Sequence, residues 1–404
     1  MSFLSSLFDY RWTILFYSAI LLAVYVFRKK LERQGSFMYI IRTKIGLQFM
    51  DKISSAARKP IIWLGYAGIV IAYIGFFFIS YVLLQGTYDL LIDKPGAVGG
   101  GPVIPGLPIG GTGIVFPLVI GWISLLIIMV VHEGAHGILA RAHNIKVKSS
   151  GLAFLGPILG AFVEPDEKDM QKKKHRVQHS VLAAGPVSNL VLWIVCMILI
   201  VYVLSPAVSG LAISAGIYAS PIKNDSLPAM KAGFTEKTVI VGINNAKIND
   251  SVSFFSSLEN LTPGQKLRID TLSGEHYDLT TIKNPENKSK GYIGITKFEQ
   301  YYAPKIEGPL GNILLSVLLW FIELLEWTAF ISFNIGLINL FPIFITDGAQ
   351  MLKLNFLHLI HDKKKALNYW KSVNIVALMM VFIMLFLPLL RTLFKFAISF
   401  VLSI

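Results

Sequence analysis

Two histidines and a glutamate in the segment VVHEGAHGILAR, residues 130 to 141, have the types and the spacing of a zinc site. His132 and His136 are four residues apart, so on a helix both imidazoles lie on one face, with Glu133 beside them. Imidazoles bind zinc, and a carboxylate next to the metal can accept a proton from an activated water. The segment therefore predicts metal-assisted hydrolysis with Glu133 as general base.

The composition of the chain places this motif in a membrane. Residues 114 to 131, which lead into it, contain no charged side chain. The whole chain of 404 residues is 54% hydrophobic and 15% charged, with a mean hydropathy of +0.61, which is wrong for a soluble protein. The single cysteine, Cys196, excludes an internal disulfide and a thiolate zinc site, and its apolar neighbours predict a core position.

Apolar segments predict a multi-pass α-helical membrane protein with about six spans. The expected spans are residues 12–27 (an uncleaved signal anchor), 61–85, 114 into the HEGAH motif, 180–204, 327–345 and about 373–390. Basic residues among apolar ones predict an amphipathic helix on an anionic membrane face at 31–60. We expect the segment 308–326, which ends in two glutamates, to be an interfacial helix rather than a span.

Two segments differ from these helices. Residues 150–165 are too short and too interrupted by glycine and proline to cross, which predicts a re-entrant loop or β hairpin that dips toward the active site. Residues 206–303 alternate short strand-like runs with turns, and their runs SLPAMKAGF, TVIVGINNAKI and LENLTPGQKLRIDTLSGE resemble a PDZ domain; a generic small β domain is the alternative. The predicted divisions of the chain are 1–113, 114–205, 206–303, 304–326 and 327–404.

The distribution of basic residues predicts the topology. The loops 28–60, 141–179 and 353–371 contain 22 of the 37 Lys and Arg residues, which makes these loops cytoplasmic and puts the inserted β domain outside. The net charge of +13 therefore reflects membrane topology, and we expect no nucleic-acid partner. The predicted location is the cell membrane, with the zinc motif near the cytoplasmic face.

A catalytic zinc needs a third protein ligand, and Asp347 is the best candidate. It ends an apolar span with no basic neighbour within several residues, where a carboxylate is usually functional or paired. Asn189 and Asn339 carry amides in apolar surroundings; they are candidates to stabilise an oxyanion, with helix packing as the alternative. Pro342 should break its helix and free backbone groups. The remaining six histidines are expected at solvated surfaces: His143, His175, His179, His276, His358 and His361.

Three motifs together resemble the site-2 protease family of intramembrane zinc metalloproteases. They are HEGAH at 132–136, AGPVSN at 184–189, and NLFP at 339–342 leading to Asp347-Gly348, in the family's order and with a PDZ-like insertion between the second and third. The resemblance implies that His132, His136 and Asp347 bind Zn²⁺ and that Glu133 is the catalytic base. It also implies that Asn189 and Asn339 position the substrate or stabilise the oxyanion. The 150–165 hairpin would correspond to the family's membrane-associated β element, and the residues expected to bind substrate are Gly156, Gly160, Phe162 and Pro342.

The function expected from these features is intramembrane cleavage of transmembrane segments in other membrane proteins. A substrate helix must unwind to expose a peptide bond, and strand addition to the 150–165 hairpin would hold it extended. The PDZ-like domain would act as a size filter. The alternatives are a metal transporter, which a single deep polar cluster disfavours, and an inert scaffold, which the intact Glu133 disfavours. The partners expected are transmembrane protein substrates and the lipid bilayer, and the oligomeric state is left open.

Overall fold

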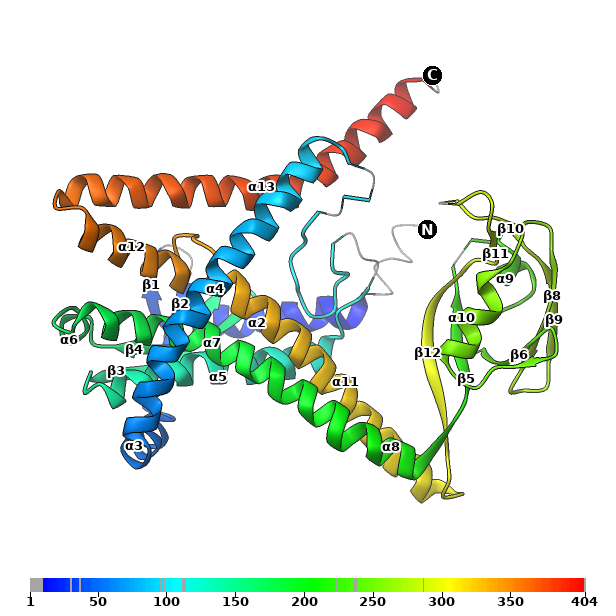
Figure 1. The fold of residues 1–404 in the computed structure, drawn as a ribbon, viewed down its shortest axis with the longest axis horizontal. Coiled ribbons are helices and arrows are strands. Elements are labelled where there is room, and N and C mark those ends of the chain that lie inside the picture. The colour runs from blue at the N-terminus through cyan, green and yellow to red at the C-terminus, as the bar shows by residue number, and fades with distance from the viewer. Residues whose placement is uncertain are drawn as a thin grey trace. The chain divides into compact units, whose positions relative to one another are not determined.

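The computed structural model describes residues 10–402, except positions 30, 36–37, 95, 98, 111–113, 223, 236–237 and 286. The chain divides into two compact units: Met1–Ile200 with Ile322–Ile404, and Val201–Phe321. Helices dominate the first unit and strands the second (Figure 1).

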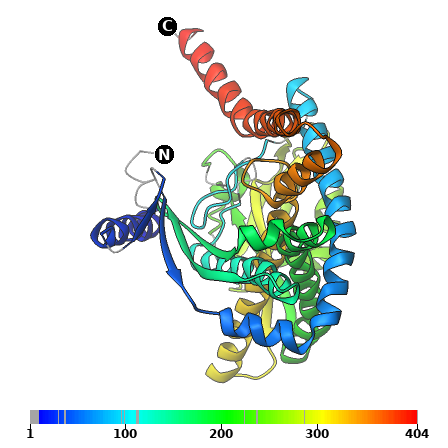
Figure 2. The same ribbon diagram turned by 90° about the vertical axis from the view of Figure 1, so that its left-hand side faces the viewer.

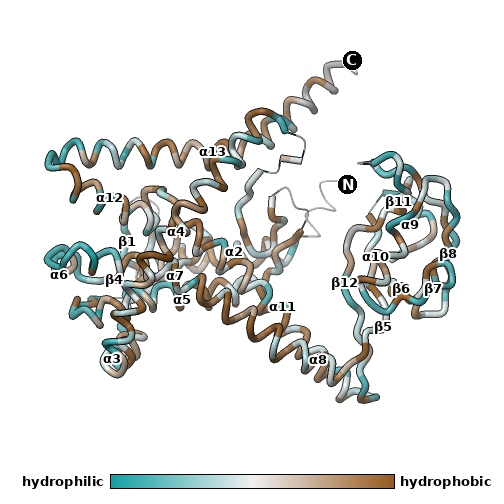
Figure 3. Tube along the Cα trace, in the orientation of Figure 1, coloured by the Kyte–Doolittle hydropathy of each residue, from teal (hydrophilic) through white to brown (hydrophobic). Residues whose placement is uncertain are grey.

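Five helices among the described residues are long and apolar enough to cross a membrane. They are α4 (Arg58–Leu91), α5 (Leu118–Ala142), α7 (His175–Leu199, which continues through a π-helical turn, Ile200–Leu204, and α8, Ser205–Leu211), α11 (Pro309–Ile338) and α13 (Lys363–Leu402). Figure 3 shows hydrophobic residues along α7 and α11. Large apolar side chains on α4 point outward, such as Trp63 (75% exposed) and Phe77 (67%), as lipid-facing residues do. The protein is therefore a multi-pass helical membrane protein with a β domain.

The first predicted span forms a helix, α2 (Arg11–Phe27), that is apolar but only 17 residues long. Tyr17 donates a hydrogen bond through its hydroxyl to the carbonyl of Pro105, and Thr13 donates one to the carbonyl of Gly106. These bonds attach α2 to the segment between α4 and α5. Whether α2 crosses the membrane stays a prediction.

The predicted division between an interfacial helix and a span at residues 326 and 327 is wrong. α11 runs unbroken from Pro309 to Ile338, because Glu323 and Glu326 are good helix formers and their carboxylates do not interrupt the backbone hydrogen bonds. The expected span to residue 345 is also too long, since the helix ends at Ile338. The helix-breaking effect of Pro342 is confirmed: residues 339–346 form a turn before α12 (Asp347–Leu359) begins.

The predicted amphipathic helix at 31–60 is mostly wrong. Residues 32–43 form two strands, β1 (Glu32–Gln34) and β2 (Met38–Thr43), and only α3 (Leu47–Ala56) is a separate helix before α4 begins. The run MYIIRT contains β-branched and aromatic residues, which favour a strand once a partner strand is available. That partner is β3 (Val147–Leu155), more than one hundred residues later in the chain, so the sequence nearby gives no sign of it.

The predicted hairpin at 150–165 is confirmed as a β hairpin. It consists of β3 and β4 (Ile158–Pro165), with Gly156 in the turn at a positive φ of 60°. The strand order is β1-β2-β3-β4, so β4 is an edge strand. Figure 2 shows the blue strand β2 beside this hairpin. The ion pair between Arg42 Nε and Glu164 Oε2 (3.2 Å), and that between Arg42 and Glu32, connect the strands.

The second unit contains a five-strand path of antiparallel strands with two short helices. The order is β12-β5-β6-β8-β9, and β7 pairs with β6. Its elements are β5 (Ala212–Pro221), α9 (Pro228–Lys231), β6 (Val239–Ile243), β7 (Ala246–Lys247), α10 (Ser251–Glu259), β8 (Lys266–Thr271), β9 (His276–Thr280), β10 (Ile282–Lys283), β11 (Gly291–Tyr292) and β12 (Ile295–Pro304). Phe254 of α10 is completely buried against Ile240 and Ile269 of the sheet in one apolar core. A β domain in this part of the chain is thus confirmed.

Candidate metal centre

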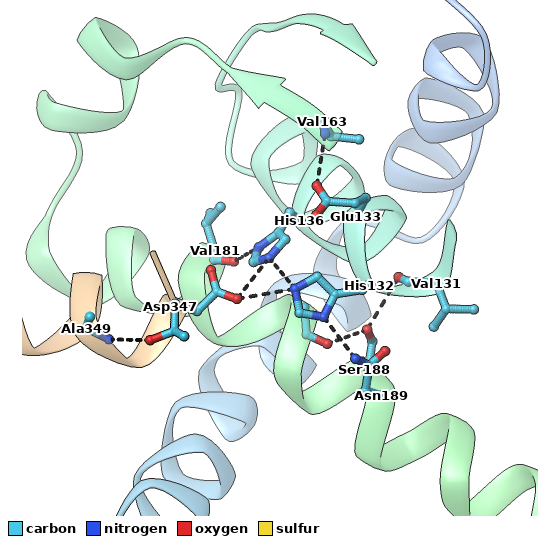
Figure 4. A network of polar contacts seen from close by, with 12 residues as sticks. Val131, His132, Glu133, His136, Val163, Val181, Ser188, Asn189, Asp347 and Ala349 are labelled. Carbon is cyan, nitrogen blue, oxygen red and sulfur yellow. Dashed lines mark hydrogen bonds and ion pairs between the residues drawn. The ribbon is translucent and has the colours of Figure 1, made fainter. Parts of the chain in front are cut away.

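The zinc motif lies on α5, where helical periodicity brings its two histidines together. The Nε2 atoms of His132 and His136 are 3.3 Å apart. Asp347, the first residue of α12, reaches both: its Oδ2 lies 3.3 Å from His132 Nε2 and 3.5 Å from His136 Nε2. The three ligand atoms all lie within 4.8 Å of one another (Figure 4). Residues more than two hundred positions apart therefore form one compact group.

The turn between α11 and α12 positions Asp347. Thr346 caps α12 by accepting a hydrogen bond at Oγ1 from the amide of Ala349 (3.3 Å). The amide of Gly348 donates to the carbonyl of Asn339 (2.8 Å), and a Cβ at position 348 would overlap the backbone of Leu340. Only glycine permits this close approach, so Gly348 allows the turn to close and place the carboxylate of Asp347 beside α5.

A stripe of three residues on α7 forms the wall behind the two imidazoles. Val181, Gly185 and Asn189 are spaced by four residues, so they lie on one face of the helix. The Val181 carbonyl accepts a hydrogen bond from His136 Nδ1 (2.7 Å), and the amide of Asn189 lies 3.0 Å from His132 Nδ1. A Cβ on Gly185 would lie 2.5 Å from His132 Nε2, so no side chain fits between α7 and the ligand atoms.

These contacts fit a zinc ion held by three protein ligands. A histidine that donates from Nδ1 to a carbonyl carries its lone pair on Nε2, which is the usual state of a zinc-binding imidazole. His136 has this arrangement with Val181. Asn189 is completely buried, and among the described residues its Oδ1 has no hydrogen-bond partner. A rotation of the Asn189 amide by a half-turn exchanges its nitrogen and oxygen atoms. Oδ1 then accepts a hydrogen bond from the Nδ1–H of His132, and His132 has the same tautomer as His136. Two nitrogen donors and one oxygen donor leave a fourth position open.

Glu133 faces a cavity of about 380 Å³ beside the ligand group. We call this the active-site cavity. The Oε2 atom of Glu133 accepts a hydrogen bond from the backbone amide of Val163 on the edge strand β4 (2.9 Å; Figure 4). Most of the wall is apolar, and the residues that line it are Ile128, Met129, His132, Glu133, His136, Val163, Pro165, Met170, Val181, Leu182, Ile335, Asn339, Ile345 and Asp347.

The two asparagines expected to act on substrate occupy different places. Asn339 lines the active-site cavity, so its amide can reach a bound peptide. Asn189 is buried behind His132 and contacts the imidazole instead. The carbonyl of Asn189 also accepts a hydrogen bond from Ser332 of α11 (2.8 Å), which holds α7 against α11. Asn189 is therefore in contact with His132 of the metal-binding group, and of the two asparagines it is Asn339 that lines the cavity.

The hairpin residues expected to bind substrate do not form the described wall of the cavity. Gly156 is in the distant turn, Gly160 pairs with Ala153, and the ring of Phe162 covers Gly151 on the sheet itself. Val163 and Pro165 line the cavity instead. Pro342 is buried in the turn after α11, outside the described lining.

Two of the other histidines are buried, although all six were expected at solvated surfaces. His143 follows α5 and is 9% exposed, and His179 on α7 is 3% exposed. His179 donates from Nδ1 to the carbonyl of His175 (3.1 Å), and its ring stacks on Tyr73 of α4. The reason is that the first turns of α7 pack against α4 and α12 rather than extending into solvent. The described residues place neither histidine in the metal-binding group. Cys196 is buried, as predicted.

Sequence reasoning missed Val181, Gly185 and Val163. The four-residue spacing through Gly185 to Asn189 on an expected helix could have pointed to the α7 stripe. The Val163 contact uses a backbone amide, so no side chain in the sequence signals it.

Candidate membrane spans and a partly buried group of two histidines and an aspartate beside a glutamate are the features of a membrane metalloprotease. A family model for peptidase family M50 matches residues 120–387. The chain is 30% identical over 345 residues to an uncharacterized protein of Methanocaldococcus jannaschii, covering 83% of this chain and 81% of that one. It is 24% identical over 316 residues to a Clostridium acetobutylicum protein named as a candidate zinc metalloprotease, covering 62% and 89%. The chain belongs to peptidase family M50, the site-2 protease family.

Removing the amide of Asn189 should weaken zinc binding. In an Asn189→Ala variant the Nδ1 of His132 has no partner inside a buried site, and its ring is free to turn. We expect a loss of about 10- to 100-fold in zinc affinity, the usual effect of removing such an outer contact. Competition with a chromophoric chelator measures the zinc affinity of the variant. Ser188→Ala, one position away and outside the ligand contacts, should bind zinc as the wild type does; equal affinity in both variants would contradict the role of Asn189.

Proposed function

We propose that this protein is an intramembrane zinc endopeptidase that cleaves transmembrane segments of other membrane proteins. The observation that carries the proposal is the group of His132, His136 and Asp347 beside Glu133, because both histidines and the glutamate lie on α5, a helix long and apolar enough to cross a bilayer. In this proposal the three residues hold Zn²⁺. When bound, zinc supplies Lewis acidity toward a water molecule and a peptide carbonyl.

Glu133 acts as the general base and then as the proton donor. Its free carboxylate oxygen accepts a proton from the attacking water and delivers it to the amide nitrogen of the cleaved bond. The amide of Val163 holds the other oxygen and so fixes the direction of the carboxylate. Asn339 is placed to donate a hydrogen bond to the oxygen that becomes negative during attack.

The apolar wall of the cavity supports a hydrophobic substrate. Ile128, Met129 and Ile335 offer contacts to the side chains of a transmembrane segment rather than to a polar peptide. A helical segment has no free backbone groups, so it must unwind before cleavage. Because the amide of Val163 points away from β3, those of Ala161 and Leu159, at alternate positions, point the same way along the edge strand. An unwound substrate can pair with them.

The topology and the second unit complete the proposal. The three basic loops lie in the cytoplasm, six spans cross the cell membrane, and the active site lies near the cytoplasmic face. The β domain lies outside, has the PDZ-like fold that its sequence resembles, and admits substrates whose outer part is already shortened.

Reconstitution tests the function directly. The purified protein in liposomes should cleave a labelled single-span substrate inside the apolar segment, as mass spectrometry of the products would show. A chelator should stop cleavage and added zinc should restore it. Zinc flux across the liposome without cleavage of any single-span substrate would instead support a transporter and refute the proposal.

The hydrogen bond from Val163 to Glu133 gives a further prediction. Val163→Pro removes the amide hydrogen, and an edge strand tolerates proline where the N–H points outward. One hydrogen bond to a charged acceptor contributes about 1.5–3 kcal/mol, so kcat should fall by about tenfold or more while KM changes little. Val163→Ala keeps the amide and serves as the control. If the two variants have the same kcat, the amide does not position the base.

A further inference from the structure

A second cavity, lined by basic residues, lies where the ends of two candidate spans meet. α4 begins at Arg58 and α5 ends at Ala142, and Arg58 Nε donates a hydrogen bond to the carbonyl of Ala142 (2.8 Å). The cavity has a volume of about 650 Å³. Its cations are Lys52 of α3, Arg58, Arg141 and Lys146, and we call it the basic cavity.

The charges in the basic cavity are not balanced. Two carboxylates line it, but Asp51 is paired with Arg141 (2.9 Å) and Asp169 with Lys172 (3.8 Å). Among the described residues, no carboxylate lies within ion-pair distance of Lys52, Arg58 or Lys146. The nearby cations also act on His143: burial lowers the pKa of its imidazole first, and neighbouring positive charges, Arg58 among them, lower it further. The cavity therefore has a net positive potential that an anion would neutralise.

The surroundings place this cavity at the depth of lipid headgroups. Arg58 starts a candidate span, and Trp63, little more than one turn into α4, is 75% exposed. Tryptophan is enriched at this level of a bilayer. Ile45, just before α3, is 79% exposed, and Phe49 on α3 is 63% exposed. These apolar side chains are also available to a membrane.

An apolar groove lies about one turn further along the same helices, lined by Ile61 of α4 and Ile138 of α5, where the basic cavity is lined by Arg58 and Arg141. It has a volume of about 410 Å³ and is lined by α4, α5 and α7. Ile61, one turn after Arg58, lines it, and the small residues Gly68 and Ala135 leave room for it. A positive pocket at a span end, followed by an apolar groove directed into the membrane, has the shape and charge of a phospholipid.

We propose that the basic cavity and the apolar groove together bind one anionic phospholipid. The phosphate lies among Lys52, Arg58 and Lys146, and an acyl chain lies between α4, α5 and α7. A free phosphate would use the cations and leave the groove unfilled. A substrate helix would use the groove without the cations. Because Ala135 lies between the two zinc-motif histidines, the bound lipid contacts the helix that carries them.

Lipid titration followed by native mass spectrometry tests this site without measuring cleavage. The purified protein in detergent is titrated with dioleoylphosphatidylglycerol, and we expect one saturable lipid. The double variant Lys52→Gln/Lys146→Gln should bind it about tenfold more weakly, since each basic residue near a lipid headgroup contributes to attraction. Lys363→Gln/Lys364→Gln, the same charge change at the start of α13, is the matched control and should bind as the wild type does.

A second variant examines the groove. A Cβ at Gly68 meets only ordinary contacts, at 3.7 Å from Val187, so Gly68→Leu can fold and fill the groove. It should also weaken lipid binding by about tenfold through the loss of acyl-chain contact. An unchanged zinc content confirms that each variant is folded.

Three results would overturn the proposal. One is equal binding by the Lys52/Lys146 double variant and its control. Another is equal affinity for phosphatidylcholine, or displacement of the lipid by inorganic phosphate alone, which would indicate a site without headgroup selectivity or a simple anion site. The third is a Gly68→Leu variant that binds the lipid normally, which would leave the groove to another occupant such as a substrate helix.

Discussion

Glu133→Gln should abolish cleavage of a membrane substrate and leave zinc binding intact. A positioned general base contributes 10²–10⁴ in rate, so we expect kcat to fall by about 10³-fold. Glutamine has the same shape and keeps an oxygen that can accept the hydrogen bond from Val163, so the strand contact at 2.9 Å is preserved and only the proton acceptor is lost. The zinc content of the purified variant and single-turnover cleavage of a labelled substrate measure the two effects separately.

Glu167→Gln is the matched control for this variant. Glu167 is an exposed residue in the first turn of α6 (Glu167–Gln171), outside the described lining of the active-site cavity. The Glu167→Gln substitution removes one carboxylate charge close to the site and leaves the proposed base unchanged. The kcat of this variant should equal that of the wild type. Wild-type cleavage by Glu133→Gln would refute the proposed mechanism, whereas loss of zinc from it would mean that the carboxylate supports the metal site.

Gly185→Ala should remove zinc from the protein. The added Cβ would lie 2.5 Å from His132 Nε2 and closer still to His136 Nε2, so both ligand atoms must move. The neighbours leave little freedom for this, because Val181 and Asn189 hold the opposite sides of the same rings. We expect zinc affinity to fall by at least about 100-fold, the upper end for changes around metal ligands. Equilibrium zinc titration gives the affinity, and cleavage should fall with zinc occupancy.

Gly134→Ala tests whether this effect comes from contact with the ligands. Gly134 lies inside the HEGAH motif itself, yet a Cβ there meets no atom within 4 Å. Alanine also favours a helix over glycine by about 1 kcal/mol, so this variant should bind zinc normally and be slightly more stable. If Gly134→Ala loses zinc and Gly185→Ala keeps it, the assignment of α7 as the wall of the metal site is incorrect.

The metal centre depends on helices that lie far apart in the chain. α5 supplies two imidazoles and the proposed base, α12 supplies the carboxylate, and α7 supplies a wall with no side chain at its centre. Because the helices contribute different groups, substitutions on them should have different effects. Loss of the proposed base should stop catalysis, whereas a side chain added to the wall should stop metal binding.

The residues of the centre were predictable because their patterns are local. The spacing of His132 and His136 needs only a helix, and a carboxylate such as Asp347 at the end of an apolar span stands out because burial of an unpaired charge is unfavourable. The β hairpin was predictable for a similar reason, since 16 residues with a Gly-Pro turn cannot cross a bilayer. The joining of Asp347 to α5 was expected because a catalytic zinc needs a third protein ligand, and the structure brings the three ligand atoms within 4.8 Å of one another.

The sequence by itself thus determined the membrane class, four of the long helices, the hairpin and the three residues that the structure gathers into one group. Tertiary structure decided the strands at 32–43, because their partner β3 is distant in the chain, and the unbroken α11, because polar residues near its middle do not disrupt helical hydrogen bonds. It also decided that the amide of Asn189 contacts His132 and that the amide of Val163 donates a hydrogen bond to Glu133. These last features depend on backbone groups and on the direction of a buried side chain, which are set only when separate elements pack together.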